Sequence, residues 1–131
     1  MNMIELTGIN KIYRTNEIET QALENVNLNV EKGEFLSIMG PSGCGKSTLL
    51  NIMGLLDTPT SGTIQIAGTR VEGMKDKELA AFRNKNLGFV FQSFHLINSL
   101  NVIDNVELPL LYRNVSAKER RHLAEEVLKK V

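Results

Sequence analysis

Two stretches of the chain alternate apolar and polar residues with a period of two. One is Asn25–Val30 and the other is Thr63–Ala67. This alternation is typical of strands with one buried face, which are most often antiparallel. We expect these two strands to pair with each other and to form a small antiparallel sheet. Residues 3–9 mix apolar and polar positions and are predicted to form a first strand.

Two other stretches, Glu34–Met39 and Leu87–Phe91, are mostly apolar with little alternation. Such runs are typical of strands that are covered on both faces in a parallel sheet. Both are therefore predicted to be interior strands. Because their neighbouring strands are missing from the sequence, we expect open sheet edges, and an isolated chain that is poorly stable, aggregates or takes cover from another copy.

Apolar residues at helical spacing predict the helices, and the polar stretch Lys11–Thr20 predicts a loop. The last helix begins at a capping box, Ser116-Ala117-Lys118-Glu119. The predicted helices are a buried one with Leu49, Leu50, Ile52, Met53, Leu55 and Leu56, a short one over residues 76–83 with Leu79 and Phe82 inward, a helix or helical turn over residues 102–111 that Pro109 interrupts, and a final one with Leu123, Ala124, Val127 and Leu128 on one face.

A glycine-rich loop, Gly40-Pro41-Ser42-Gly43-Cys44-Gly45-Lys46-Ser47-Thr48, lies between the first interior strand and the buried helix. It fits the pattern G-x-x-x-x-G-K-[ST], and strand, glycine loop and helix are the context that this pattern requires. Its glycines allow positive φ and a close approach of the backbone to a ligand. Successive N–H groups and the N-terminus of the helix would then form an anion-binding nest.

The last residues of this loop carry the chemistry that a nucleotide requires. Lys46 would place a full charge near the β- and γ-phosphates, Ser47 would offer a hydroxyl to Mg²⁺, and Thr48 would offer a second hydroxyl near the phosphates. The alternative is a glycine turn that ends in Lys-Ser by chance. The flanking strand and helix favour the phosphate-binding interpretation.

Composition narrows the classes of partner. The 131 residues suffice for one small domain, and fifteen basic and fifteen acidic residues cancel, so a nucleic-acid partner is not implied. No stretch is long and apolar enough to predict a transmembrane span or a signal peptide. The only cysteine, Cys44, allows no intrachain disulfide, which fits the cytoplasm.

With the loop and the strands in place, the sequence resembles the ATP-binding subunit of an ABC transporter. It is most similar to the branch that includes lipoprotein-release and macrolide-export ATPases, and the phosphate loop alone would indicate only a P-loop NTPase. The segments that carry the resemblance are Ile12–Tyr13, Ala22–Val26, Gly33–Phe35, Met39–Leu50, Gly54–Gly62, Gly88–Gln92 and Asn105–Leu110.

The resemblance implies an α/β fold with a P-loop NTPase (RecA-like) core and an N-terminal antiparallel β subdomain. The fold is expected to be incomplete, a partial nucleotide-binding domain. Its β strands and core would occupy residues 1–92, and the loop after Gln92 with the start of a helical subdomain would occupy residues 93–131.

The resemblance also implies site residues. Tyr13 would stack on adenine, and Gln92 would contact Mg²⁺ and the attacking water, which makes Lys46 and Gln92 the catalytic residues and Ser47 and Gln92 the metal ligands. Tyr13 could instead be a structural tyrosine, and Gln92 a solvated residue that ends a strand. The implied ATP-binding set is Tyr13, Gly40, Pro41, Ser42, Gly43, Cys44, Gly45, Lys46, Ser47, Thr48 and Gln92.

The partners implied are ATP, Mg²⁺, a second nucleotide-binding subunit and a transmembrane permease. The permease would be contacted near Gln92–Leu100, on the cytoplasmic face of the inner membrane. The apolar residues Phe94–Leu100 could equally form a satellite apolar cluster. His95 and His122 have no metal-ligand spacing and are interpreted as non-catalytic.

The sequence also departs from the family pattern. It contains no Leu-Ser-Gly-Gly-Gln signature, no apolar strand that ends in Asp-Glu and no switch histidine. The resemblance is therefore to a member truncated before the signature and Walker B motifs, and these 131 residues alone are expected to be inactive as an ATPase. The alternatives are a non-hydrolysing nucleotide-binding module, an ABC ATPase of a non-transporting complex such as a cell-division type, and, more distantly, a P-loop kinase.

Overall fold

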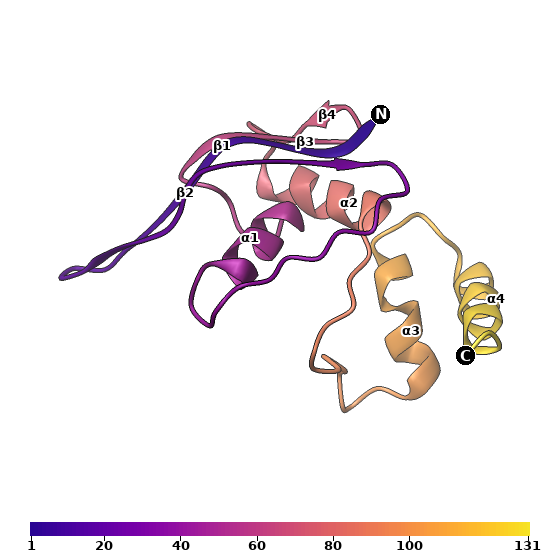
Figure 1. Cartoon of the computed structure of the whole chain (residues 1–131). Coiled ribbons are helices and arrows are strands. Elements are labelled where there is room, and N and C mark those ends of the chain that lie inside the picture. Colours follow the sequence, from indigo (N-terminus) through magenta and orange to yellow (C-terminus); the bar gives the residue numbers. More distant parts are fainter. The chain divides into compact units, whose positions relative to one another are not determined.

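The computed structural model describes all 131 residues (Figure 1). The chain divides into two compact units, Met1–Arg83 and Asn84–Val131. The units are described separately below.

The first unit is built on a four-stranded antiparallel sheet. Its strands are β1 (Asn2–Arg14), β2 (Glu19–Glu31), β3 (Ser61–Ile66) and β4 (Thr69–Arg70), in the order β2-β1-β3-β4. The prediction of antiparallel strands is confirmed, but the predicted pairing of the two alternating strands is wrong. β3 pairs with β1, with Ile64 opposite Leu6 and Ile66 opposite Ile4. Alternation specifies the buried face of a strand and not its neighbour.

β1 and β2 form a long hairpin, so the predicted loop over Lys11–Thr20 is also wrong. Tyr13 pairs with Thr20 and Arg14 with Glu19, and the Thr15 N–H donates to the Ile18 carbonyl at 2.8 Å. This end of the hairpin projects from the rest of the sheet in Figure 1. Residues 13–20 are all exposed, so this part of the hairpin has no alternation of buried and exposed positions from which a strand could be predicted.

The core of the first unit combines the sheet with helix α1 (Lys46–Met53). Leu6, Ile9 and Ile52 are at most 1% exposed. The helix is less buried than predicted, because Leu50 and Leu56 remain 53% and 47% exposed. The other buried residues of this core are Leu23, Leu55, Ile64, Ile66 and Val71.

Helix α2 (Asp76–Asn86) follows the sheet and begins at the residue predicted to start it. Leu79 and Phe82 are half-buried, as the apolar spacing indicates. The Arg83 guanidinium donates to the carbonyl of Leu55 at 2.6 Å. Because Leu55 follows α1 directly, this bond joins α2 to the end of α1.

The two predicted interior strands do not form. Glu34–Met39 is irregular and pairs with no strand, and Phe35 and Met39 are 98% and 86% exposed. Residues 87–91 are likewise irregular, although the Phe89 and Phe91 rings stack at 5.5 Å as side chains two positions apart in an extended segment do. Neither segment joins the sheet, and a strand forms only where its backbone can hydrogen-bond to a neighbouring strand.

The second unit contains helices α3 (Val102–Leu111) and α4 (Ala117–Leu128). Asn101 caps α3 by accepting from the Asp104 N–H, and Ser116 caps α4 by accepting from the Glu119 N–H, as the capping box predicts. Pro109 lies inside α3. Of the four apolar residues predicted on one face of α4, Ala124 is buried, Leu128 is half-buried, and Leu123 and Val127 are exposed.

None of the helices combines the length and the apolar character that a bilayer crossing requires.

We predict that Ile52→Ala lowers the free energy of unfolding by about 2–5 kcal/mol, because it leaves a cavity in the core. The matched control is Leu50→Ala in the same helix, which removes the same number of atoms from a 53% exposed position and should cost far less. Urea unfolding followed by circular dichroism measures both. Equal losses would contradict the assignment of the buried face of α1.

Candidate phosphate-binding site

The glycine-rich loop is curled and open to solvent. Gly43 and Gly45 have φ values of 79° and 99°, in the left-handed region that glycine adopts without strain. The Cys44 N–H donates to the Pro41 carbonyl at 3.3 Å and closes a turn. Residues 40–44 are all exposed. The backbone is thus turned back on itself and exposed, and is not extended.

Gly45 ends the loop where it meets strand β2. A Cβ built on Gly45 would lie 2.7 Å from the Ala22 carbonyl oxygen and 3.1 Å from Leu23 Cδ2. Only glycine fits this approach without displacing the backbone of β2. The end of the loop is therefore held against the sheet by direct packing.

The N-terminus of α1 is left without the usual caps. Gly45 is the N-cap residue and offers no side chain, and the first turn contains no acidic residue. The first hydrogen bond of the helix runs from the Leu49 N–H to the Gly45 carbonyl at 2.9 Å. The amides before Leu49 have no acceptor within the helix, and together with the helix dipole they favour an anion.

Lys46 brings the one full charge of the loop. Its ammonium donates to the carbonyls of Gly40 and Pro41, the latter at 2.7 Å, and lies 3.6 Å from Cys44 Sγ. These acceptors are neutral and solvent-exposed. The lysine is therefore held at the loop by contacts that an oxyanion can replace.

The structure contains no group of three or more His, Cys, Asp or Glu side chains that could hold a metal ion. Ser47 is exposed in the first turn of α1, and Thr48 is half-buried beside it. The hydroxyl of Ser47 is an oxygen donor of the kind that Mg²⁺ accepts beside phosphate oxygens and water. The residues present therefore fit a magnesium ion that arrives with a phosphate ligand.

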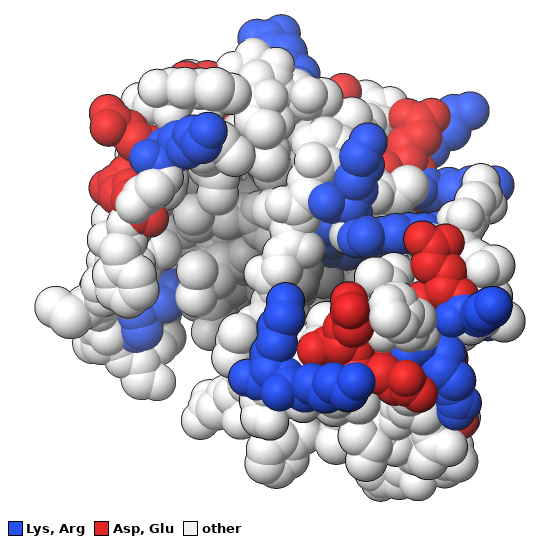
Figure 2. All heavy atoms as spheres, turned by 90° about the vertical axis from the view of Figure 1, so that its right-hand side faces the viewer, with Lys and Arg blue, Asp and Glu red and all other residues white.

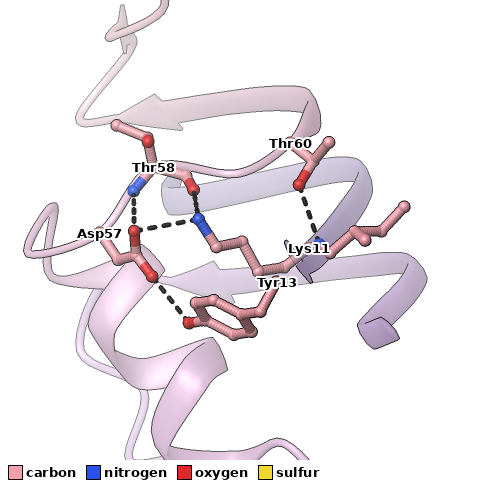
Figure 3. Close-up of polar contacts among 6 residues, drawn as sticks. Lys11, Tyr13, Asp57, Thr58 and Thr60 are labelled. Carbon is pink, nitrogen blue, oxygen red and sulfur yellow. Dashed lines mark hydrogen bonds and ion pairs between the residues drawn. The ribbon is translucent and has the colours of Figure 1, made fainter. Parts of the chain in front are cut away.

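Tyr13 lies near the end of β1 and is 42% exposed. Its hydroxyl donates to Asp57 Oδ2 at 2.8 Å, and the Lys11 ammonium lies 4.9 Å from the ring centroid (Figure 3). Lys11 also donates to Asp57 Oδ1 at 3.1 Å and to the Thr58 carbonyl at 2.7 Å. The Thr58 N–H completes the set with a 2.8 Å bond to Asp57 Oδ1.

The Asp57 carboxylate is stabilised in its ionised form. Burial alone would raise the pKa of Asp57, but hydrogen bonds from Tyr13, Lys11 and the Thr58 amide, with the charge of Lys11, hold that pKa below its ordinary value of 3.8. We call Lys11, Tyr13, Asp57 and Thr58 the Asp57 cluster.

Sequence reasoning missed this cluster, because its members are 44–47 residues apart along the chain and Lys11 was assigned to a loop. The only local signal was Asp57 followed by Thr58 in a turn, which is typical of an aspartate that binds a nearby amide. A second hydrogen bond between these segments, from the Ile12 N–H to Thr60 Oγ1 at 2.9 Å, also cannot be predicted from the apolar periodicity (Figure 3).

Gln92 belongs to the second unit, where it is exposed and follows the segment predicted to be a strand. The loop after it carries exposed apolar side chains. Phe94 and Leu96 are 91% and 62% exposed, and a cavity of about 320 Å³ lies among the loop and α3. Residues that line this cavity include Leu96, Ile97, Leu100, Val102 and Val106.

Asn105 of α3 fixes the shape of this loop. Its Oδ1 accepts from the Ile97 N–H at 2.9 Å, and its Nδ2 lies 2.9–3.2 Å from the carbonyls of Ile97, Leu100 and Asn101. His95 packs on the Phe91 ring at 4.6 Å, and His122 pairs with Glu126 at 3.4 Å.

Charged side chains of both signs are interspersed on the face drawn in Figure 2. This distribution agrees with the balanced composition of the chain.

We predict that Gly45→Ala destabilises the fold more than Gly33→Ala. Both residues have positive φ, at 99° and 82°, so each alanine carries the left-handed cost of about 1–2 kcal/mol. Only Gly45 adds a clash with the Ala22 carbonyl, because nothing lies within 4 Å of a Cβ at Gly33. Equal losses in urea unfolding would show that the loop does not pack on β2.

We predict that the stabilisation from Asp57 depends on pH. A carboxylate whose folded pKa lies below 3.8 contributes stability above that value, and the contribution is lost as the pH falls through the folded pKa. The difference in unfolding free energy between the parent and Asp57→Asn should therefore be constant near neutral pH and shrink in acid. Urea unfolding across a pH series tests this, with Glu78→Gln on α2 as the control. A difference that does not change with pH would refute it.

Comparisons with known proteins identify the family. The family model described as ABC transporter matches residues 23–131. The chain is 49% identical over 126 residues to the lipoprotein-releasing system ATP-binding protein LolD of Bacteroides thetaiotaomicron, covering 96% of this chain and 56% of LolD. It is 42% identical over 131 residues to the macrolide export ATP-binding/permease protein MacB of Mannheimia succiniciproducens, covering all of this chain and 20% of MacB.

A solved structure gives the same result for the fold. The dimeric ATP-binding cassette MJ0796 of Methanocaldococcus jannaschii, in a post-hydrolysis state bound to ADP and Pi, is 48% identical with a TM-score of 0.86. The match covers 97% of this chain and 56% of that one, so the chain spans about half the length of such relatives. The resemblance and the fold class predicted from the sequence are confirmed. The chain therefore belongs to the family of ABC transporter ATP-binding proteins.

Proposed function

We propose that these residues form the nucleotide-binding part of an ABC transporter ATPase, with Mg-ATP held by the loop from Gly40 to Thr48. The observation that carries the proposal is the uncapped N-terminus of α1, which follows two left-handed glycines and has no acidic residue in its first turn. Amides without helical acceptors and one adjacent ammonium form a site for a polyphosphate.

We propose the following roles for the residues of the site. The amides from Gly43 to Thr48 would bind the phosphate oxygens. The Lys46 ammonium would exchange its bonds to the Gly40 and Pro41 carbonyls for bonds to the β- and γ-phosphates. Ser47 would ligate the magnesium ion, which when bound neutralises charge on the phosphates. Tyr13, 42% exposed on β1, would stack on the adenine ring.

Gln92 and the loop after it are proposed to link the nucleotide site to a permease. Gln92 would contact the metal and the attacking water, and the exposed apolar side chains between Phe94 and Leu100 would meet the membrane subunit. The support is the exposure of Phe94 and Leu96, and a relative whose name joins ATP-binding and permease. The protein would then act at the cytoplasmic face of the inner membrane, exporting or releasing a substrate.

We propose further that the intact protein works as a dimer of nucleotide-binding subunits, since the related cassette MJ0796 is dimeric. Within these 131 residues there is no Leu-Ser-Gly-Gly-Gln stretch and no apolar strand ending in Asp-Glu. On their own, the 131 residues should therefore bind Mg-ATP without measurable turnover.

We predict that Lys46→Ala weakens Mg-ATP binding by at least about tenfold, because a hydrogen bond to a charged group contributes about 1.5–3 kcal/mol. Calorimetry on material shown by circular dichroism to be folded measures the loss. The control is Lys118→Ala on the exposed face of α4, which should bind as the parent does. Equal affinity in Lys46→Ala and the parent would remove the phosphate site from the proposal.

A further inference from the structure

We infer that Asp57 is a positioning residue for the adenine base, acting through the hydroxyl of Tyr13 and the ammonium of Lys11. This inference rests on the proposed function, in which Tyr13 stacks on adenine, and adds to it a residue in the turn after α1. Asp57 does not contact the base itself. It sets the orientation of the ring on which the base would lie.

The geometry holds the ring at two points. The Tyr13 hydroxyl is bound at its edge by Asp57 Oδ2 at 2.8 Å, and the Lys11 ammonium lies over one face, 4.9 Å from the ring centroid (Figure 3). Tyr13 is nevertheless 42% exposed. A base would therefore stack on the face that Lys11 does not cover.

The two groups that hold the ring are themselves fixed. Asp57 Oδ1 receives the Lys11 ammonium at 3.1 Å and the Thr58 N–H at 2.8 Å, while Lys11 also reaches the Thr58 carbonyl at 2.7 Å. The side chains of Lys11 and Asp57 are 12% and 30% exposed. The depressed pKa of Asp57 agrees with a carboxylate that stays ionised under these contacts.

The cluster also connects parts of the first unit that are distant in sequence. Lys11 and Tyr13 belong to β1, whereas Asp57 and Thr58 follow α1, the helix that begins at Lys46. The turn after α1 therefore holds the ring that would bind the base, and the start of α1 carries the amides that would bind the phosphates.

A purely structural role would look different in solution. If Asp57 only fastens β1 to the turn after α1, its loss should weaken the binding of every ligand of the site equally, because the fold itself is weakened. If it orients Tyr13, its loss should affect a ligand with a base and spare one without. Mg-ATP and Mg-tripolyphosphate are such a pair of ligands.

The experiment uses the 131-residue chain with Tyr112→Phe, because the sequence has two tyrosines and no tryptophan, so that Tyr13 becomes the only tyrosine. Asp57→Asn and Tyr13→Phe are made in this background, with Glu78→Gln as the control. Tyr13→Phe keeps the ring and removes only the bound hydroxyl. Calorimetry gives the affinity for both ligands in every variant, and tyrosine emission reports stacking wherever Tyr13 is present.

Asp57→Asn and Tyr13→Phe should each lower the affinity for Mg-ATP about three- to tenfold. This loss corresponds to part of the free energy that stacking of a base contributes. In each variant, the affinity for Mg-tripolyphosphate should stay within about twofold of the parent value. Saturating Mg-ATP should quench Tyr13 emission less in Asp57→Asn than in the parent. Because the two changes break the same bond, Asp57→Asn should cost less in the Tyr13→Phe background than alone.

Unchanged Mg-ATP affinity in both variants would overturn the inference, as would an equal loss for the two ligands. A parent that binds tripolyphosphate as tightly as ATP would also overturn it, while leaving the phosphate site in place. A folded parent that binds neither ligand would overturn the proposed function and this inference with it.

Discussion

The approach of Gly45 to the Ala22 carbonyl is the constraint on which the candidate site depends. Backbone meets backbone there, because a Cβ at Gly45 would lie 2.7 Å from the oxygen. Helix α1 begins at the next residue, carries the fully buried Ile52 into the core, and is followed by Leu55, whose carbonyl is bound by Arg83. The helix is therefore held near both ends, and its packing sets the direction of its free amides.

Sequence reasoning recovered the parts of the molecule whose signals are local. Alternation located the strands that became β2 and β3, since each has one face on the core. The capping box at Ser116 marked the start of α4, because a cap is formed by residues within one turn. The glycine-rich loop was recognised from its spacing, and two of its three glycines, Gly43 and Gly45, have the left-handed conformation that glycine permits, whereas Gly40 does not.

The missed features are those set by distant partners. Residues 34–39 and 87–91 have the composition of interior strands, but strand formation depends on neighbours that these residues do not have. The alternation of apolar residues in β3 does not indicate which strand it pairs with, so its pairing with β1 could not be predicted. The bond from Tyr13 to Asp57 joins residues 44 positions apart, and neither residue signals the other. Tyr13 itself was singled out only through the family resemblance.

Asn105 illustrates how a loop can be held without relying on its own side chains. The Asn105 amide reaches only peptide groups, those of Ile97, Leu100 and Asn101, whereas exposed residues such as Leu96 take no part in these bonds. Surface chemistry and backbone shape are therefore encoded by different residues. Over evolution, the displayed side chains can be exchanged to suit another protein while the scaffold beneath them is kept, so that changes of affinity need not be changes of architecture.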